Sequence, residues 1–146
     1  MTHKKRTLSK ILKLKDNRKK ELELEVKKAS DRADAEKAKL RALEKDYADT
    51  VEFFNEKNSR GPVDVNKINA CHDHFSRING KISEQKKIHD QHQRELESLK
   101  NNLVDAHKDK KAFEILNDKA VKKDRREKVI LEQKESDFIA ISRRIK

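Results

Sequence analysis

The sequence predicts an all-α protein, an antiparallel two-helix coiled-coil hairpin whose second helix extends beyond the first. Three observations predict this fold class. Charged residues make up 45% of the 146 residues and hydrophobic residues only 33%, which is too little apolar material for a compact globular core. Apolar residues nevertheless recur at spacings of three and four, as in helices that pack along one stripe. The single proline, Pro62, follows Gly61 between the two periodic stretches, and these breakers divide the chain into two helices.

The first helix is expected over about residues 5–58. A row of residues at alternating spacings of three and four runs along it. Several positions in the row are polar, so we expect a narrow coiled-coil seam with polar layers and not a broad apolar face. The row consists of Leu8, Leu12, Lys15, Lys19, Leu22, Val26, Ala29, Ala33, Glu36, Leu40, Leu43, Tyr47, Thr50 and Phe54.

A turn is expected over residues 59–65, where the first row stops. Glycine is favoured just past a helix end and proline in the first turn of the next helix, and Asp64 or Asn66 can cap that helix. The second helix is expected over about residues 66–143, because a second row holds its phase to the C-terminal end. This row consists of Ile68, Cys71, Phe75, Ile78, Ile82, Gln85, His89, His92, Leu96, Leu99, Leu103, Ala106, Lys110, Phe113, Asn117, Ala120, Asp124, Glu127, Leu131, Lys134, Phe138, Ile141 and Ile145.

Folding the chain at the turn pairs residues whose numbers sum to about 122, as hairpin geometry requires. This register sets Tyr47 against Phe75 and Val26 against Leu96. It also sets small alanines against bulky histidines, an alternation that favours close packing. The whole chain, 1–146, is therefore expected to form a single coiled-coil hairpin.

The end of the second helix is expected to be unpaired. Residue 120 lies opposite residue 2 in this register, so a segment of about residues 120–146 has no intrachain partner. An exposed amphipathic helix is a docking element for another surface, and fraying or self-association is the alternative. The apolar residues of this segment are Val129, Ile130, Leu131, Phe138, Ile139, Ile141 and Ile145.

Features of enzymes and of metal sites are missing from the sequence. The chain has two glycines, so it lacks a glycine-rich phosphate loop, and one seam offers no concave pocket. We therefore expect no enzyme and no cofactor. Cys71 with His74, and His89 with His92, form two pairs that each face one way. These pairs lie about 27 Å apart along a straight helix, whereas structural zinc needs four ligands together, so no metal site is expected.

The net charge of +11 is concentrated at the two chain ends. Two basic clusters, Lys13–Lys20 and Lys122–Lys128, are expected to lie near each other at the open end of the hairpin. A basic coiled coil that binds nucleic acid is therefore one alternative function, although the clusters lack stacking aromatic residues and no specific nucleic acid is expected. A structural homo-oligomeric coiled coil is the other alternative.

Other features bear on the cellular location. No apolar run approaches the roughly 18 residues that a membrane span needs. Cys71 is the only cysteine, which suits a reducing compartment. A cytoplasmic location is therefore expected.

Four features of the chain together resemble one known family. They are the start LSKILKLKDNRKKELELEV, the reversal near residue 60, the run of Phe75, Ile78, Ile82 and Gln85, and the end LEQKESDFIAISRR. With the chain length, they make the sequence similar to the flagellar export protein FliJ family and its YscO-type injectisome counterparts, over nearly the whole chain. The resemblance implies a stalk-like coiled coil that binds the hexameric export ATPase, promotes its assembly and activity, and helps to recycle export chaperones. It also implies contact with a membrane export gate protein, and hence peripheral association with the inner-membrane export apparatus.

The resemblance also implies two sets of contact residues. The open end, which carries both termini, is the part expected to enter the ATPase ring. The gate contact is expected on the second helix, on residues spaced i, i+4, i+7 and i+11; Asn79 departs there from an apolar pattern, and our register places Phe75 and Ile82 in the seam. The ATPase set is Leu8, Leu12, Arg125, Arg126, Leu131, Phe138 and Ile141, and the gate set is Phe75, Asn79, Ile82 and Lys86.

Overall fold

The computed structural model describes residues 3–59, 61–62 and 64–145. Helix α1 spans His3–Asn58, and the longer helix α2 spans Val65–Ile145. The two helices pack against each other along side chains from both, so the expected fold class is confirmed. The expected turn and the expected unpaired segment include residues that lie outside the described part of the chain. These residues are Arg60 and Val63 in the expected turn and Lys146 in the expected unpaired segment. Met1 and Thr2 at the start of the chain also lie outside the described part.

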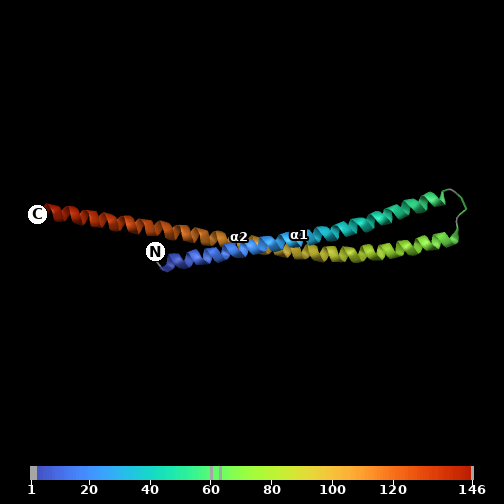
Figure 1. The fold of residues 1–146 in the computed structure, drawn as a ribbon, viewed down its shortest axis with the longest axis horizontal. Coiled ribbons are helices and arrows are strands. Elements are labelled where there is room, and N and C mark those ends of the chain that lie inside the picture. Colours follow the sequence, from blue (N-terminus) through green and yellow to red (C-terminus); the bar gives the residue numbers. More distant parts are fainter. Residues whose placement is uncertain (1–2, 60, 63, 146) are drawn as a thin grey trace. The chain divides into compact units, whose positions relative to one another are not determined.

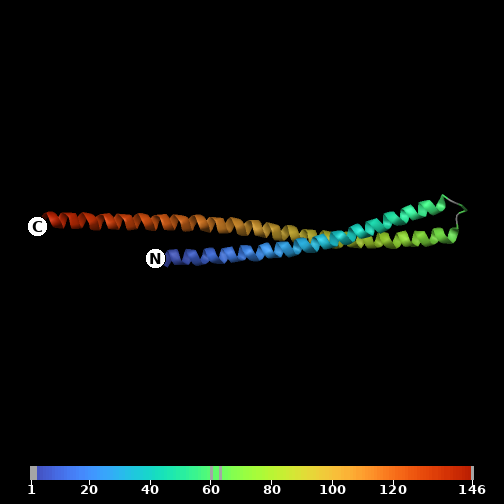
Figure 2. The same ribbon diagram turned by 45° about the horizontal axis from the view of Figure 1, so that its top comes forward.

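Contacts divide the chain into two units, and each unit contains a part of both helices. Unit 1 combines Met1–Leu22 with Asn102–Lys146, and unit 2 is Glu23–Asn101. Within each unit the two helical segments lie side by side, as both Figure 1 and Figure 2 show. Each unit is therefore described by itself.

The two rows of the sequence define which residues are covered. All members of the α1 row, from Leu8 to Phe54, are buried or half-buried, and so are all members of the α2 row from Ile68 to Asp124. In unit 2 the centre of the seam is an apolar cluster in which small side chains of α1 face large ones of α2. This cluster contains the buried residues Ala29, Ala33 and Leu96, with Val26 and Leu99 packed against them.

Aromatic rings hold the part of unit 2 nearer to the turn. Tyr47 packs edge-on against Phe75 with ring centroids 5.3 Å apart, which confirms the expected pairing of these two residues. Phe54 approaches the same Phe75 ring at 6.1 Å, again in an edge arrangement. Such edge-to-face contacts add to the free energy gained by burying the rings, so this ring cluster stabilises the helix pair close to the turn.

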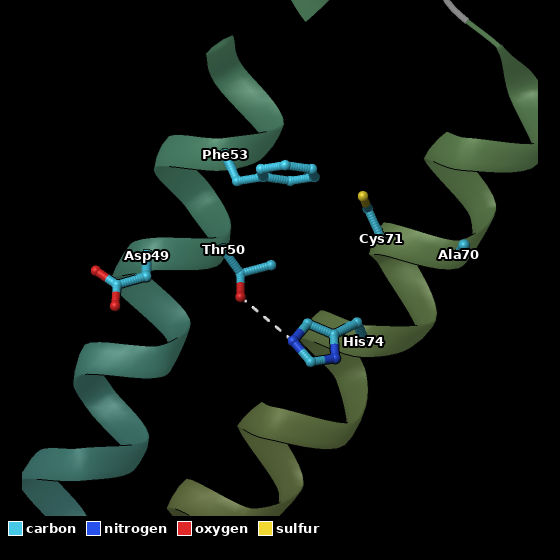
Figure 3. A pocket seen from close by; sticks show the side chains of 6 residues that line it. All are labelled: Asp49, Thr50, Phe53, Ala70, Cys71 and His74. Carbon is cyan, nitrogen blue, oxygen red and sulfur yellow. Dashed lines mark hydrogen bonds between the residues drawn. The ribbon is translucent and has the colours of Figure 1, made fainter. Parts of the chain in front are cut away.

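A polar contact between the helices lies beside the aromatic rings. The Thr50 hydroxyl donates to the Asp46 carbonyl oxygen at 2.8 Å, and its oxygen lies 3.2 Å from His74 Nε2 (Figure 3). Because the hydroxyl proton is already engaged, Nε2–H of His74 is the donor to Thr50. This contact links the two helices across the seam.

The start of α2 is capped as expected by Asp64. Its Oδ1 accepts a hydrogen bond from the backbone N–H of Asn66 at 3.0 Å, and its carbonyl oxygen accepts one from the N–H of Ile68 at 3.1 Å. The side chain satisfies a backbone donor that the helix itself leaves unpaired. Asp64 therefore fixes where α2 begins after the reversal.

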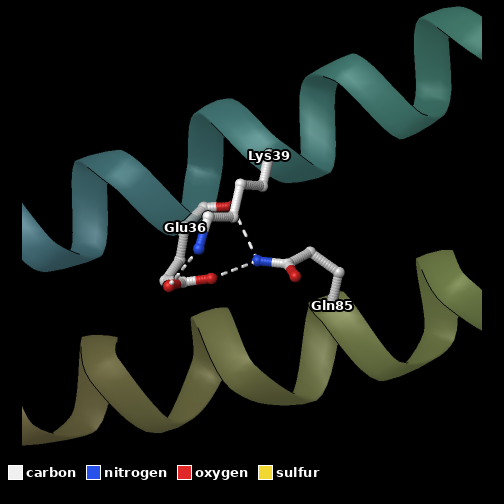
Figure 4. A network of polar contacts seen from close by, with 3 residues as sticks. All are labelled: Glu36, Lys39 and Gln85. Carbon is white, nitrogen blue, oxygen red and sulfur yellow. Dashed lines mark hydrogen bonds and ion pairs between the residues drawn. The ribbon is translucent and has the colours of Figure 1, made fainter.

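A polar layer interrupts the apolar seam in the middle of unit 2. Gln85 is the buried polar residue among the described residues, and its Nε2 donates to the carbonyl oxygen of Glu36 at 3.1 Å and also to the Glu36 carboxylate. Lys39 forms an ion pair with the same carboxylate at 3.2 Å (Figure 4). The hydrogen bond from Gln85, followed by that from Lys39, holds the pKa of Glu36 below its ordinary value. A buried polar layer of this kind helps to select one helix register.

Replacing Gln85 by alanine is expected to raise the pKa of Glu36, because the largest cause of its depression is removed. In the native protein the stability that this carboxylate contributes is complete above its unfolded-state pKa and is lost as the pH falls through the lowered folded-state pKa. Carbon-detected NMR titration of the carboxyl groups measures the shift. An unchanged Glu36 pKa in Gln85→Ala would contradict this assignment.

Candidate docking surface

The seam of unit 1 contains more charged residues than that of unit 2. The Asp16 carboxylate lies 2.8 Å from Lys110 Nζ and 3.1 Å from Lys20 Nζ. Lys15 forms an ion pair with Asp109, and its ammonium also lies over the Phe113 ring of α2 at 5.3 Å from the centroid. The first part of α1 is therefore held to α2 by charge as well as by the apolar members of its row.

The ion pairs of this seam change the ionisation of two of its members. The hydrogen bond from Lys110, and then that from Lys20, lowers the pKa of Asp16, and the bond to Asp16 raises the pKa of Lys110. The stability contributed by Asp16 is lost as the pH falls through its lowered folded-state pKa. That contributed by Lys110 is lost as the pH rises through its raised folded-state pKa. Both contributions are present at neutral pH.

High salt is expected to loosen the first part of α1 while leaving the apolar cluster of unit 2 unchanged. Screening shortens the Debye length from about 10 Å at 0.1 M salt to about 3 Å at 1 M. Amide hydrogen exchange in residues 8–20 should become faster by a factor of about two to five, whereas residues 26–40 should not respond. Exchange mass spectrometry at the two salt concentrations measures both segments. Equal responses of both would contradict a charge-held seam in unit 1.

Beyond Asp124, no described residue of unit 1 covers α2. From Arg125 to Ile145, a segment that we call the overhang, every residue is exposed except Ser142, which is half-buried. Both views show this red end of α2 continuing past the start of α1 (Figure 1 and Figure 2). The side chain of Phe138 is 70% exposed. The other exposed large apolar residues of the overhang are Val129, Ile130, Leu131, Ile139, Ile141 and Ile145.

The residues of the ATPase set fall into two groups. Leu8 and Leu12 are half-buried in the seam of unit 1. The other five residues of the set lie exposed on the overhang. These are Arg125, Arg126, Leu131, Phe138 and Ile141.

The gate set, which belongs to unit 2, is divided in a similar way. Phe75 packs on Tyr47 and Phe54, and Ile82 is half-buried in the same row. Asn79 and Lys86 are exposed. The four residues therefore form one edge of α2 that is half seam and half free surface.

Basic residues of the two chain ends meet differently from our expectation. Lys13–Lys20 faces the part of α2 around Asp109 and Lys110, so it does not lie beside Lys122–Lys128. Instead, Lys5 pairs with Asp124 at 3.4 Å. The reason is the register itself, because residues whose numbers sum to about 122 set Lys13–Lys20 against residues 102–109. Lys5 reaches Asp124 because helix side chains tilt toward the N-terminus.

The ion pair between Lys5 and Asp124 lies among a group of cations at the start of the overhang. All of them are exposed, and none is paired with a carboxylate in the ranges that the structure describes. We call this group the basic collar. It consists of Lys4, Arg6, Lys122, Lys123, Arg125, Arg126 and Lys128.

The described ranges offer neither a cluster of metal ligands nor a membrane-spanning stretch. No group of three or more His, Cys, Asp or Glu side chains in those ranges is arranged to hold a metal ion. Cys71 and His74 line a hollow near the turn, while His89 and His92 are half-buried in the seam. Neither described helix contains a stretch with the length and apolar character needed to cross a bilayer.

Comparison with known families connects this geometry to a biological process. The sequence model of a family described as flagellar FliJ protein matches residues 4–146. The chain belongs to this FliJ family. It is therefore a flagellar export-associated protein, and its family implies interaction with components of the export apparatus. Comparisons of this FliJ-family chain with curated proteins and with solved structures gave no match.

Sequence reasoning missed two surface features of this FliJ-family chain. The contribution of Lys4 and Arg6 to the basic collar depends on which residues the first turn of α1 reaches, and periodicity does not report this. Phe53 is exposed beside the seam residue Phe54. Its position outside the row of spacings is the one signal that could have drawn attention to it.

Proposed function

We propose that this chain is a non-enzymatic stalk subunit of the flagellar type III export apparatus, which docks its overhang on the hexameric export ATPase and stimulates ATP hydrolysis. The observation that carries the proposal is the run of exposed apolar residues that continues the seam row beyond Asp124. In the seam, the same row is covered by α1. The overhang thus has the pattern of a helix that packs against another surface, but it has no such surface within unit 1.

The apolar stripe of the overhang is large enough to drive docking. Leu131, Phe138 and Ile141 follow each other at spacings of seven and three residues, so they share one face of α2. Burial of one such side chain contributes about 1.5–3 kcal/mol. Three of them would supply much of the free energy of a micromolar complex, which is about 8 kcal/mol.

Charges within the stripe disfavour a parallel pair of overhangs as the docking arrangement. Glu127 and Lys134 occupy two positions of the same row. In a parallel pair of overhangs, Lys134 would face its own copy and Glu127 would do the same, and like charges in a seam destabilise it. A surface with an acidic group opposite Lys134 and a basic group opposite Glu127 avoids this repulsion.

The basic collar supports a partner that is acidic around the entrance to its apolar site. Seven exposed cations would raise the association rate with such a surface, and this attraction weakens as salt rises. We therefore expect the ATPase to present carboxylates to the collar and apolar side chains to the overhang. The half-buried Leu8 and Leu12 would hold the first turns of α1 in place beneath the collar.

We also propose that the export gate and export chaperones contact this chain, with Asn79 and Lys86 as the accessible part of the gate surface. Phe75 and Ile82 would position that edge of α2 from the seam. Binding of the gate protein to Asn79→Ala/Lys86→Ala, measured against the unchanged protein, tests this contact. Full binding by the double variant would exclude this edge as the gate surface.

Truncation tests the proposed ATPase contact. A chain that ends at Asp124 keeps all covered positions of both rows, so its helix pair should still form. Its affinity for the cognate ATPase, measured by biolayer interferometry, should fall to the detection limit. Equal affinity of the truncated and full-length chains would show that the overhang is not the docking element.

A further inference from the structure

Unit 2 has a second surface feature, which lies beside the turn and is independent of the overhang. Three neighbouring hollows share Phe53 as a lining residue. The side chain of Phe53 is 55% exposed, whereas Phe54 beside it is half-buried in the seam. Packing within the chain therefore accounts for Phe54 but leaves most of the Phe53 ring open to a partner.

The first hollow lies between the two helices and has a volume of about 370 Å³. In Figure 3, the Phe53 ring points from α1 toward α2, and Cys71 points back toward α1. The hydrogen bond between Thr50 and His74 crosses from one helix to the other beside them. This arrangement makes a groove with an aromatic wall and a small-residue wall, completed by Ala70.

The second hollow, of about 330 Å³, continues the groove toward the turn. Phe53, Ala70 and Cys71 line both hollows, so the two are contiguous. Phe54, Ile68 and Pro62 add further apolar surface. The groove therefore has room for one or two large side chains and a short stretch of backbone.

Charges of both signs surround the groove. Lys57 and Lys67 line the second hollow, and the Lys57 ammonium lies over the Phe53 ring at 5.4 Å from the centroid. Asp64 also lines the second hollow, where it accepts the capping hydrogen bond from Asn66, while Glu56 lines the third hollow and Asp49 the first. A carboxylate on a ligand would therefore find its ion-pair partners, Lys57 and Lys67, at the second hollow and not at the far end of the groove.

We propose that this groove, centred on Phe53, binds a short peptide segment of another protein in which large apolar side chains stand next to carboxylates. The apolar side chains would pack on Phe53 and Cys71 between the helices. The carboxylates would pair with Lys57 and Lys67. The site lies in unit 2, and the proposal does not depend on docking of the overhang to an ATPase.

A peptide titration of the full-length protein tests the proposal. The probe is a capped hexapeptide with two central leucines, two aspartates on one side and two serines on the other, and its binding is followed by two-dimensional amide NMR. We expect saturable shifts at Phe53, Lys57 and Ile68 with a Kd of about 1 mM. One control peptide carries asparagines in place of the aspartates, another carries alanines in place of the leucines, and both should bind at least fivefold more weakly.

Two variants locate the binding surface. Phe53→Ala should weaken binding of the acidic hexapeptide at least tenfold, and Lys57→Gln/Lys67→Gln should weaken it about threefold to tenfold, as expected for rim charges. Phe138→Ala is the matched control, because it removes an equally large exposed ring from unit 1, and it should bind normally. Circular dichroism checks that each variant keeps its helix content.

Several results would overturn the proposal. The first is the absence of shifts up to about 10 mM peptide, tenfold above the expected Kd. The second is equal binding of the asparagine peptide, which would remove the role of the two lysines. The third is unchanged binding by Phe53→Ala. Self-association that depends on Phe53, seen by analytical ultracentrifugation, would identify a second copy of this chain as the occupant instead.

Discussion

Replacing Phe138 and Ile141 together by alanine is expected to weaken binding of the export ATPase by about 100-fold or more. These two side chains are 70% and 57% exposed in the overhang. Each contributes about 1.5–3 kcal/mol when it is buried, and about 1.4 kcal/mol corresponds to a tenfold change in Kd. Helix content should stay the same, because neither side chain is covered within unit 1. Fluorescence anisotropy with the labelled chain measures the change in Kd.

The matched control for this experiment is Phe53→Ala, which removes an exposed ring from unit 2 and should leave ATPase binding unchanged. If the double variant bound the ATPase as tightly as the unchanged protein, the exposed stripe would not be the contact. If it lost helix content, the two side chains would have a structural role that the exposed overhang does not explain. Either result would contradict the docking role of these residues.

Replacing Leu96 by alanine is expected to lower the free energy of unfolding by about 2–4 kcal/mol. Leu96 is 5% exposed and packs against Ala29 and Ala33. The facing alanines are too small to move into the space that the leucine would leave. Urea unfolding followed by far-UV circular dichroism measures the effect.

Leu24→Ala provides the control for this loss of stability. It makes the same chemical change at a site that is 54% exposed, and it should cost less than about 0.5 kcal/mol. A similar cost at both positions would mean that the cluster around Leu96 does not hold the two helices of unit 2 together. In that case the free energy of unfolding would come mainly from helix formation itself.

The fold could be predicted largely from the sequence, because spacing reports burial directly in a two-helix seam. Each residue from Leu8 to Phe54 in the first row, and from Ile68 to Asp124 in the second, is covered as the periodicity predicts. The paired breakers Gly61 and Pro62 separate the two helices, and the one other glycine, Gly80, stands alone inside α2. The pairing of Tyr47 with Phe75 followed from counting outward from that turn.

Two parts of the surface could not be predicted in the same way. The basic collar depends on the tilt and length of side chains in the first turn of α1, which bring Lys5 to Asp124. The groove at Phe53 depends on the space left between the helices near the turn, and a row of spacings does not encode that separation. Both features depend on side-chain length and on the distance between the helices, and the spacing of residues along the sequence encodes neither.

The ATP hydrolysis rate of the cognate export ATPase, with and without this protein at near-physiological salt, tests whether the overhang acts on the ATPase. We expect a clear rise in rate with the full-length chain. We expect no rise with Phe138→Ala/Ile141→Ala or with the chain that ends at Asp124. An unchanged rate with the full-length chain, under conditions where the ATPase hydrolyses ATP, would contradict the proposal that the overhang stimulates the export ATPase.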